Sequence, residues 1–454
     1  MVELQENKKS QIKLSEEVKM PKVKVVLPEV LVRIRNSCES FFKKNFNTNS
    51  LKLAIFFSLP VYFNYLLLVF EIENDFLIKI LFTVDMFLAF YYLFHSKHNW
   101  FGSGFLTGLF WFWWIGLSFR YYNLSWMIPV ADILVALFYG LIFWMIFKIY
   151  GFFIRKNLYL AKFFLVIVFT FGFDYLAPFT FDWFKPEVLL INTVFDVSKT
   201  VLFLVTFSIV FYKELKWFCI VVLVIALFFK SSLPTPPKID IYVSYTMIPQ
   251  DKKWEKSFIP YEIKNNFLII NKAINLKKDV VILPESAFPL FLNAHKNLMD
   301  KLKALSKKIT IITGALHVKD SKYYNSTYVF EKGKVKILDK HVLVPFGEYI
   351  PLPFFQKEIN NLFFAGASDY MTSDKFGMFE IKGYKFINAV CYEATVEDLY
   401  KLKPNYVVAL SNDAWFMPSI MPSLQQMLIK IYAKKYGKIV FHSINGFRSY
   451  IIKG

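Results

Sequence analysis

Seven long apolar runs lie one after another between Leu51 and Lys230, and they constrain the fold more than any other feature of the chain. A helix that crosses a bilayer needs about 20 apolar residues, with about 17 as the lower end. Seven such runs in a row rarely occur as buried helices of a soluble protein, so the sequence predicts a multi-span α-helical membrane bundle over residues 51–231. The runs cover roughly residues 51–71, 77–94, 101–119, 126–148, 159–177, 190–211 and 216–230.

Two further parts flank the predicted bundle. Residues 1–50 carry many lysines and few aromatic side chains, which predicts a basic N-terminal tail with an amphipathic helix near Pro28 to Phe46. Residues 238–454 alternate strand-like and helix-like patterns, which is typical of an α/β domain. The chain is 56% hydrophobic, against roughly 45–50% in ordinary soluble domains, and the bundle holds almost all of the excess.

The distribution of basic residues predicts how the chain is oriented. The net charge is +19, and a basic chain can bind nucleic acid, but no nucleic-acid motif accompanies the charge. Lysine and arginine instead gather in the tail and near residues 148–162 and 213–216, whereas the segments 71–75 and 174–187 lean acidic. Because cytoplasmic loops carry the excess of lysine and arginine, we expect the tail in the cytoplasm. An odd number of spans then places residues 238–454 in the periplasm, beyond a bacterial inner membrane.

The α/β domain is predicted to contain several buried strands, two hairpins and three helices. One hairpin, at residues 326–338, has Gly333 in its turn, and another turns at Asn445–Gly446, which is a strong hairpin signal. Other strands are indicated at 238–248, 279–285, 308–318, 385–390 and 405–411, and helices at 258–274, 291–308 and 423–436.

Polar side chains follow four of these strands: Glu285, Lys340, Cys391 and the segment SNDAW at 411–415. Ligands of open α/β sheets bind beyond the strand ends, so these groups would converge if the ends are neighbours. A carboxylate can take the proton of a thiol and make it a nucleophile. An ammonium can hold the oxyanion of a tetrahedral intermediate. Such a set is typical of acyl transfer through a thioester.

Each of these residues also has an ordinary structural explanation. A lone buried cysteine is more often an inert, small apolar residue. A glutamate after a proline often caps a helix, and a lysine on a hairpin is usually a solvated charge. Cys38 lies in the tail and Cys219 in an apolar run, so neither can easily pair with Cys391. Spacing alone leaves both explanations open.

Several motifs resemble those of the bacterial apolipoprotein N-acyltransferases, which are membrane members of the nitrilase, or carbon–nitrogen hydrolase, superfamily. Soluble nitrilases share only the Glu, the Lys and the Cys, so the longer motifs indicate the membrane family. The stretch MIPQDKKW at 247–254 is similar to the opening of that family's soluble domain. The other motifs are LPESAFP at 283–289, LDKHVLVPFGEYIPLP at 338–353, VCYEA at 390–394 and LSNDAWF at 410–416.

The resemblance implies an αββα sandwich on a bundle of membrane helices. It implies Cys391 as the nucleophile, Glu285 as the general base and Lys340 as the oxyanion stabiliser. The enzyme would take an acyl chain from a phospholipid and pass it to the N-terminal amine of the diacylglyceryl cysteine of an apolipoprotein. No metal or diffusible cofactor is implied. Supporting or substrate-site roles are implied for Glu348, Tyr392, Glu393, Trp254, Trp415 and Phe416.

Three features depart from the family pattern. Met417 replaces the glycine of the family's WFG, and Gln425–Gln426 stands where the family has QH. The chain stops at Gly454, just after the last hairpin, which predicts a catalytic domain shortened at its C-terminus. Two alternatives stay open: a membrane-tethered nitrilase-type amidase with water as the acceptor, and a non-catalytic lipid-binding relative.

Overall fold

The computed structural model describes residues 29–73, 75–95, 100–178, 181–232, 234–345, 347–349 and 370–453. The chain divides into two compact units, residues 1–44 and 45–454. Helix α1 (Glu29–Asn45) begins in the first unit, so the helix predicted near Pro28 to Phe46 is confirmed. Residues 1–28 of the predicted tail lie outside the described residues.

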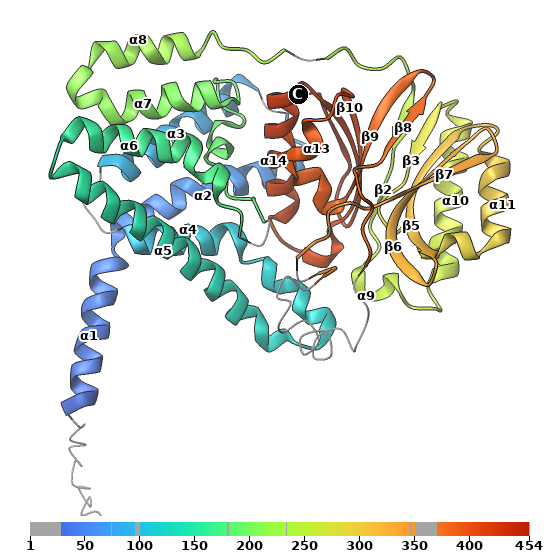
Figure 1. The fold of residues 1–454 in the computed structure, drawn as a ribbon, viewed down its shortest axis with the longest axis horizontal. Coiled ribbons are helices and arrows are strands. Elements are labelled where there is room, and N and C mark those ends of the chain that lie inside the picture. The colour runs from blue at the N-terminus through green and yellow to red at the C-terminus, as the bar shows by residue number, and fades with distance from the viewer. Residues whose placement is uncertain are drawn as a thin grey trace, which may run out of the picture. The chain divides into compact units, whose positions relative to one another are not determined.

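A helix forms in each of the seven apolar runs (Figure 1). Four helical segments are long and apolar enough to cross a membrane, namely Thr48–Val69, Phe76–His95, Ser125–Ile154 and Leu158–Tyr175. The predicted membrane bundle is therefore confirmed, while the number of seven crossings stays a prediction. The helices are α2 (Thr48–Val69), α3 (Phe76–His95), α4 (Trp100–Phe112), α5 (Ile128–Ile154), α6 (Leu158–Phe171), α7 (Lys199–Leu215) and α8 (Trp217–Ala226).

Two of the predicted runs are only partly α-helical. The run 101–119 ends as an α-helix at Phe112 and continues as the 3-10 helix η1 (Ile115–Tyr122). The run 190–211 becomes α-helical only at Lys199, where the Ser198 side chain caps α7 by accepting a hydrogen bond from the Val201 N–H at 3.2 Å. The residues before this cap follow the short helix η5 (Pro186–Leu190). Their apolar character reflects burial in the core and not a membrane helix.

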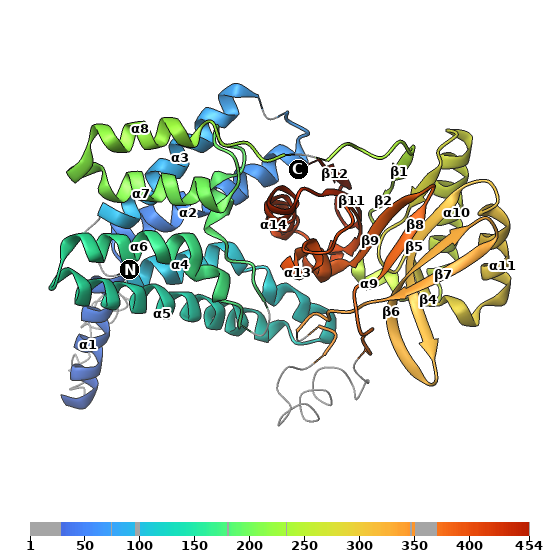
Figure 2. The ribbon, with the colours of Figure 1, turned by 45° about the horizontal axis from the view of Figure 1, so that its top comes forward.

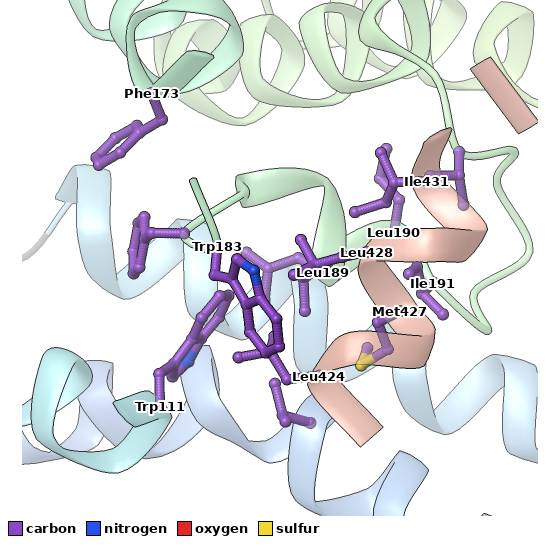
Figure 3. Close-up of a cluster of buried hydrophobic side chains, with 14 of the residues drawn as sticks. Trp111, Phe173, Trp183, Leu189, Leu190, Ile191, Leu424, Met427, Leu428 and Ile431 are labelled. Carbon is purple, nitrogen blue, oxygen red and sulfur yellow. The ribbon is translucent and has the colours of Figure 1, made fainter. Parts of the chain in front are cut away.

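Helix α14 (Met421–Tyr436) packs between the bundle and the α/β domain. Its two faces are both buried in one core, which also contains strand residues such as Ile387 and Val407. Polar side chains of α14 are also buried there, and Ser423 Oγ donates a hydrogen bond to the Val61 carbonyl of α2 at 2.8 Å. Figure 3 shows the side chains that meet on the bundle side: Trp183, Leu189, Leu190, Ile191, Leu424, Met427, Leu428 and Ile431.

The described part of the α/β domain contains two six-stranded sheets. Sheet A has the order β1-β3-β5-β6-β7, with β4 paired to β5. Its strands β1, β3 and β5 are parallel, and β6 and β7 form a hairpin at Gly333, whose φ is 79°. Helices α10 (Ile259–Asn275) and α11 (Lys296–Leu305) cover its outer face (Figure 2). The strands are β1 (Ile241–Val243), β3 (Val280–Ile282), β4 (Phe288–Phe291), β5 (Thr310–Lys319), β6 (Lys322–Glu331) and β7 (Lys334–Asp339).

Sheet B has the order β12-β11-β10-β9-β8, with β2 paired to β11. Its strands β9, β10 and β11 are parallel, and β12 returns antiparallel after Gly446, whose φ is 88°. Both predicted hairpins are therefore confirmed. Helix α14 lies on this sheet, and α13 (Glu397–Tyr400) packs against α14. The strands are β2 (Tyr245–Thr246), β8 (Met378–Ile381), β9 (Tyr384–Val390), β10 (Tyr406–Asn412), β11 (Ile439–Asn445) and β12 (Tyr450–Ile452).

The inner faces of the two sheets pack on each other, so the predicted αββα sandwich is confirmed. Ile282 and Ile312 of sheet A share a buried cluster with Phe386, Val408 and Phe441 of sheet B. Aligned sheets bury their facing side chains in this way.

Two predicted elements form with other bounds than expected. The strand predicted at 238–248 is split, because the chain leaves sheet A after β1 and joins sheet B as β2. Ser244 between them is held by both sheets: its N–H donates to Ile282 at 3.0 Å, and its carbonyl accepts from Ser443 Oγ at 2.6 Å. The helix predicted at 291–308 begins only at Lys296, because β4 and the turn after it precede it. Strands β4 and β8 were not predicted.

Candidate active site

Strand ends from both sheets bring the candidate residues together. Glu285 lies three residues after β3, and Lys340 follows β7 directly. Cys391 follows β9, and Asp413 follows β10, in the other sheet. The Glu285 carboxyl group, the Cys391 thiol and the Lys340 ammonium lie close enough to act electrostatically on one another. The predicted convergence is therefore found, but it joins two sheets and not neighbouring strands of one sheet.

The backbone is strained where the nucleophile and base candidates lie. Cys391 has a φ of 55° and Ser286, directly after Glu285, has a φ of 47°. Non-glycine residues in this left-handed region cost free energy and gather at functional sites. The carboxylate segment is also closely packed, because a Cβ on Gly314 would lie 2.5 Å from the Ser286 nitrogen and 2.7 Å from the Glu285 Cα.

Asn325 of β6 joins two carboxylates of the site, and sequence reasoning missed it. Its Nδ2 donates to Glu285 Oε1 at 2.7 Å and to Glu348 Oε1 at 3.0 Å. Its carbonyl also accepts the Lys340 N–H at 2.9 Å. This one residue therefore orients the carboxylate that faces the thiol and the backbone that carries the ammonium. No motif marks Asn325, since a polar residue on a strand is common.

Glu348 is the direct partner of the lysine. Lys340 is fully buried, and its Nζ donates to Glu348 Oε2 at 2.6 Å. The same oxygen accepts the Val344 N–H at 2.8 Å. A charge-assisted pair of this kind has a fixed geometry, so Glu348 holds the ammonium in place. The structure thus places Glu348 beside Lys340, where a supporting residue was expected.

Glu393 ties the lysine segment to the thiol segment. Its Oε1 accepts the N–H groups of His341 at 2.6 Å and Val342 at 3.0 Å, just after Lys340. Its Oε2 accepts the Val390 N–H at 2.7 Å, just before Cys391. The carboxylate is 1% exposed and satisfies three backbone donors, which is a structural task that alanine or glutamine could not reproduce.

The bundle reaches the same segment through aromatic side chains. Tyr392 stacks on Phe181, with ring centroids 6.3 Å apart and an interplanar angle of 6°. The Trp183 indole N–H donates to Thr395 Oγ1 at 2.9 Å. Both bundle residues lie in the connection between α6 and α7. The short helix that begins at Cys391 is therefore supported from the membrane half of the chain.

Burial and neighbouring charges set the protonation of the three central groups. Burial raises the pKa of the Cys391 thiol well above its usual value, and Glu285 adds to this effect. Burial also raises the pKa of Glu285, against the opposing charge of Lys340. Burial alone would lower the pKa of Lys340, but the carboxylate of Glu348 and the other acidic groups outweigh it and raise the pKa. The site therefore holds the thiol in its neutral form and Lys340 as a charged ammonium, beside the hydrogen-bonded carboxyl group of Glu285.

The remaining candidate residues lie around this centre. Trp254 follows α9 (Gln250–Lys253) and is 40% exposed. Trp415 lies against two rings of η1: it stacks on Tyr122 at 5.9 Å and 14°, and meets Tyr121 edge-on at 5.4 Å. Phe416 meets Trp114 of the bundle at 5.0 Å.

An apolar cavity of about 360 Å³ has Pro418, two residues after Phe416, in its lining. Ligand pockets typically measure about 300–1,000 Å³. The cavity is lined by Tyr62, Tyr65 and Leu66 of α2, by Trp113, and by Pro418, Ser419 and Ile420.

In the described part of the chain, no three His, Cys, Asp or Glu side chains gather in a way that could hold a metal ion.

Comparison with solved structures finds distant neighbours of the α/β domain. A carbon–nitrogen hydrolase superfamily protein from Xanthomonas campestris aligns with 47% of this chain and 79% of its own, at 15% identity and a TM-score of 0.33. An amidase from Nesterenkonia sp. aligns with 48% of this chain and 84% of its own, at 12% identity and a TM-score of 0.35.

Comparison of the sequence gives a more specific result. Residues 43–232 match the family described as the apolipoprotein N-acyltransferase integral membrane domain. The apolipoprotein N-acyltransferase of Wolinella succinogenes is 38% identical over 90% of this chain and 97% of its own length. That of Campylobacter jejuni is 37% identical over 91% of this chain and 92% of its own. The chain therefore belongs to the apolipoprotein N-acyltransferase family.

Proposed function

We propose that this protein transfers an acyl chain from a membrane phospholipid to the N-terminal amine of the diacylglyceryl cysteine of apolipoproteins. The observation that carries the proposal is the meeting of the Cys391 thiol, the Glu285 carboxyl group and the buried Lys340 ammonium, which act electrostatically on one another. Membership of the family supports the substrates, and the membrane helices support the access of a lipid.

In the first half-reaction, Glu285 takes the proton of the Cys391 thiol as the sulfur attacks an ester carbonyl of the phospholipid. The Lys340 ammonium stabilises the oxyanion that forms. When the carbon–oxygen bond breaks, Glu285 returns the proton to the leaving alkoxide. The products are an acyl thioester on Cys391 and a lysophospholipid.

In the second half-reaction, the amine of the lipoprotein attacks the thioester carbonyl. Glu285 takes a proton from the attacking amine and returns it to the departing thiolate, so the free thiol is restored. Lys340 again faces the oxyanion. A thioester is reactive enough to acylate an amine, so one nucleophile can serve both lipids in turn.

The surrounding residues have proposed roles that follow from their contacts. Glu348 holds the ammonium, and Glu393 holds the two segments that carry Lys340 and Cys391. Tyr392 is a proposed support between the thiol segment and the bundle. Trp254, Trp415 and Phe416 are proposed to face the lipid chains.

The acceptor distinguishes this function from its alternatives. Purified protein incubated with phosphatidylethanolamine vesicles and a synthetic diacylated lipopeptide is expected to give an N-acylated lipopeptide and one lysophospholipid per transfer. Both products are measured by mass spectrometry. Equally fast release of free fatty acid in the absence of lipopeptide would instead indicate an amidase-type hydrolase. Binding of lipid with neither product would indicate a non-catalytic relative.

The chain is a membrane protein, and we propose that it lies in the inner membrane with residues 238–454 in the periplasm. Ser321 lies on the exposed turn after β5. A Ser321→Cys variant is expected to react with a membrane-impermeant thiol reagent in cells whose outer membrane alone is permeabilised. Cys38, which is exposed on α1, is the internal control and should react only after lysis. Labelling of position 321 only after lysis would contradict the proposed orientation.

A further inference from the structure

Helix α1 has no part in the function proposed above, yet its sequence is strongly patterned. Its exposed side chains include Ile34, Cys38, Phe41 and Phe42. Each of these is three or four residues from another member of the set, so together they form one apolar stripe along the helix. Ile34, Phe41 and Phe42 are 53%, 46% and 58% exposed, and the rings of Phe41 and Phe42 meet edge-on at 5.9 Å. Apolar surface that gathers in this way is typical of a binding face.

The opposite side of α1 is polar and basic. The exposed side chains on that side are Arg33, Asn36, Ser40, Lys43 and Lys44. Arg35 borders the apolar stripe and pairs with Glu39, one helical turn later, at 2.9 Å. Val32, which is 41% exposed, departs from the pattern. Helices with aromatic and aliphatic residues on one side and lysine and arginine on the other lie in the boundary between lipid headgroups and acyl chains.

The chain connection places α1 at the start of the membrane bundle. Two residues separate α1 from α2, which is long and apolar enough to cross a membrane. Asn45, the last residue of α1, is buried: Ser50 Oγ donates to its carbonyl at 2.8 Å, and a Cβ on Gly102 of α4 would overlap that carbonyl. The first turns of α2 then expose the apolar side chains of Leu51 and Ile55. The apolar stripe is therefore followed directly by a lipid-facing surface.

We propose that α1 is a membrane-surface anchor whose apolar stripe enters the headgroup boundary of an anionic phospholipid surface, while its basic side faces the phosphate groups. Two observations select this partner: the stripe continues into the exposed apolar side chains of a membrane helix, and lysine and arginine complement anionic headgroups. A nucleic acid would match the charge but leave the stripe in water. A second copy of the chain would cover the stripe but bring the cations of two helices together.

The experiment uses Cys38, which is exposed and lies in the apolar stripe. The chain has three cysteines, so in the full chain with Cys219→Ala and Cys391→Ala only Cys38 remains. It is labelled in detergent with an environment-sensitive fluorophore, and the protein is reconstituted into vesicles of phosphatidylcholine and phosphatidylglycerol. We expect blue-shifted emission and strong quenching by lipids that carry a nitroxide near the headgroup.

The matched control carries the same fluorophore on the opposite side of the same helical turn. It is made by Ser40→Cys together with Cys38→Ser, since Ser40 is exposed on the basic side. Its emission should remain that of a fluorophore in water, with little quenching. The comparison of the two positions reports which side of α1 meets the lipid, and it does not depend on the orientation of the protein in the vesicle.

A second measurement tests the role of charge. Variants are compared at the phosphatidylglycerol content at which half of the wild-type helix is bound to the surface. Each lysine near an anionic surface changes binding about fivefold, so Lys43→Gln/Lys44→Gln should lower the ratio of bound to released helix about 25-fold. Lys43→Arg/Lys44→Arg keeps both charges and should bind as the wild type does.

Three outcomes would overturn the inference. One is equal emission and quenching of the two fluorophores in anionic vesicles, which would place the apolar stripe outside the lipid. Another is complete binding in phosphatidylcholine alone that Lys43→Gln/Lys44→Gln leaves unchanged. The third is efficient disulfide cross-linking of unlabelled Cys38 between two copies, which would assign the stripe to a second chain. These readouts do not involve acyl transfer, so they are independent of the proposed function.

Discussion

Cys391→Ala protein is expected to gain no mass when it is incubated with phospholipid, whereas the wild type gains one fatty acyl chain. The expectation follows from a two-step mechanism in which the first half-reaction needs only the donor. Without an amine the acyl-enzyme accumulates, because attack by water on the thioester is slow. The wild type should also release one lysophospholipid for each adduct, as measured by mass spectrometry of protein and lipid together.

The chemistry of the adduct identifies the atom that carries it. Hydroxylamine at neutral pH should remove the acyl chain, because thioesters react with it far faster than oxygen esters do. A diacylated lipopeptide should discharge the adduct and become N-acylated, while water does so slowly. Cys219 is the matched control thiol, since it is buried in α8, and Cys219→Ala should still form the adduct. An adduct of equal yield in Cys391→Ala would contradict the proposed nucleophile.

Lys340→Met is expected to lose about 10²–10³ in the rate of acyl transfer, the range found when one oxyanion donor is removed from other acyl-transfer sites. Methionine has a similar length but no charge, so the oxyanion loses its stabilising partner. The single change also leaves the partly buried Glu348 carboxylate without its cation, and removing one partner of a buried ion pair destabilises proteins by about 3–5 kcal/mol. The double variant Lys340→Met/Glu348→Gln removes both charges and should recover stability but not activity.

Two measurements separate these effects. Thermal unfolding should show the loss of stability in Lys340→Met and its recovery in the double variant, while the rate of thioester formation stays low in both. Lys334→Met, on the exposed start of β7, is the matched control and should change neither. If the double variant recovers the wild-type rate as well as its stability, Lys340 is only a structural partner of Glu348.

The broad architecture could be predicted because the sequence contains two strong signals. Long apolar runs located the bundle, and buried strands that end in polar residues located Glu285, Lys340 and Cys391. The same signals failed where burial has another cause. Residues 191–198 carry apolar side chains such as Ile191 and Phe195, yet these lie in the same core as α14 and not in a helix. Hydropathy reports burial and cannot tell which partner provides it.

Other features were invisible because they depend on tertiary contacts. The split of residues 238–248 between two sheets follows from hydrogen bonds of Ser244 to both. Asn325 contacts Glu285 and Glu348, which lie 40 and 23 residues away in the chain. The resemblance to a family predicted supporting roles for Glu348 and Glu393 before any geometry, and their contacts give these roles a physical basis.

The burial of α14 on both faces means that the two halves of this enzyme cannot be treated as interchangeable modules. A fragment cut out at the connection near residue 232 would expose Leu424, Leu428 and Ile431 to water, and large apolar patches of this kind promote aggregation. The bundle would lose its cover over residues 189–191 at the same time. Substitutions on either side of this contact must therefore be compatible with the other side, so recombination between relatives should succeed only when α14 and the segment it covers are inherited together.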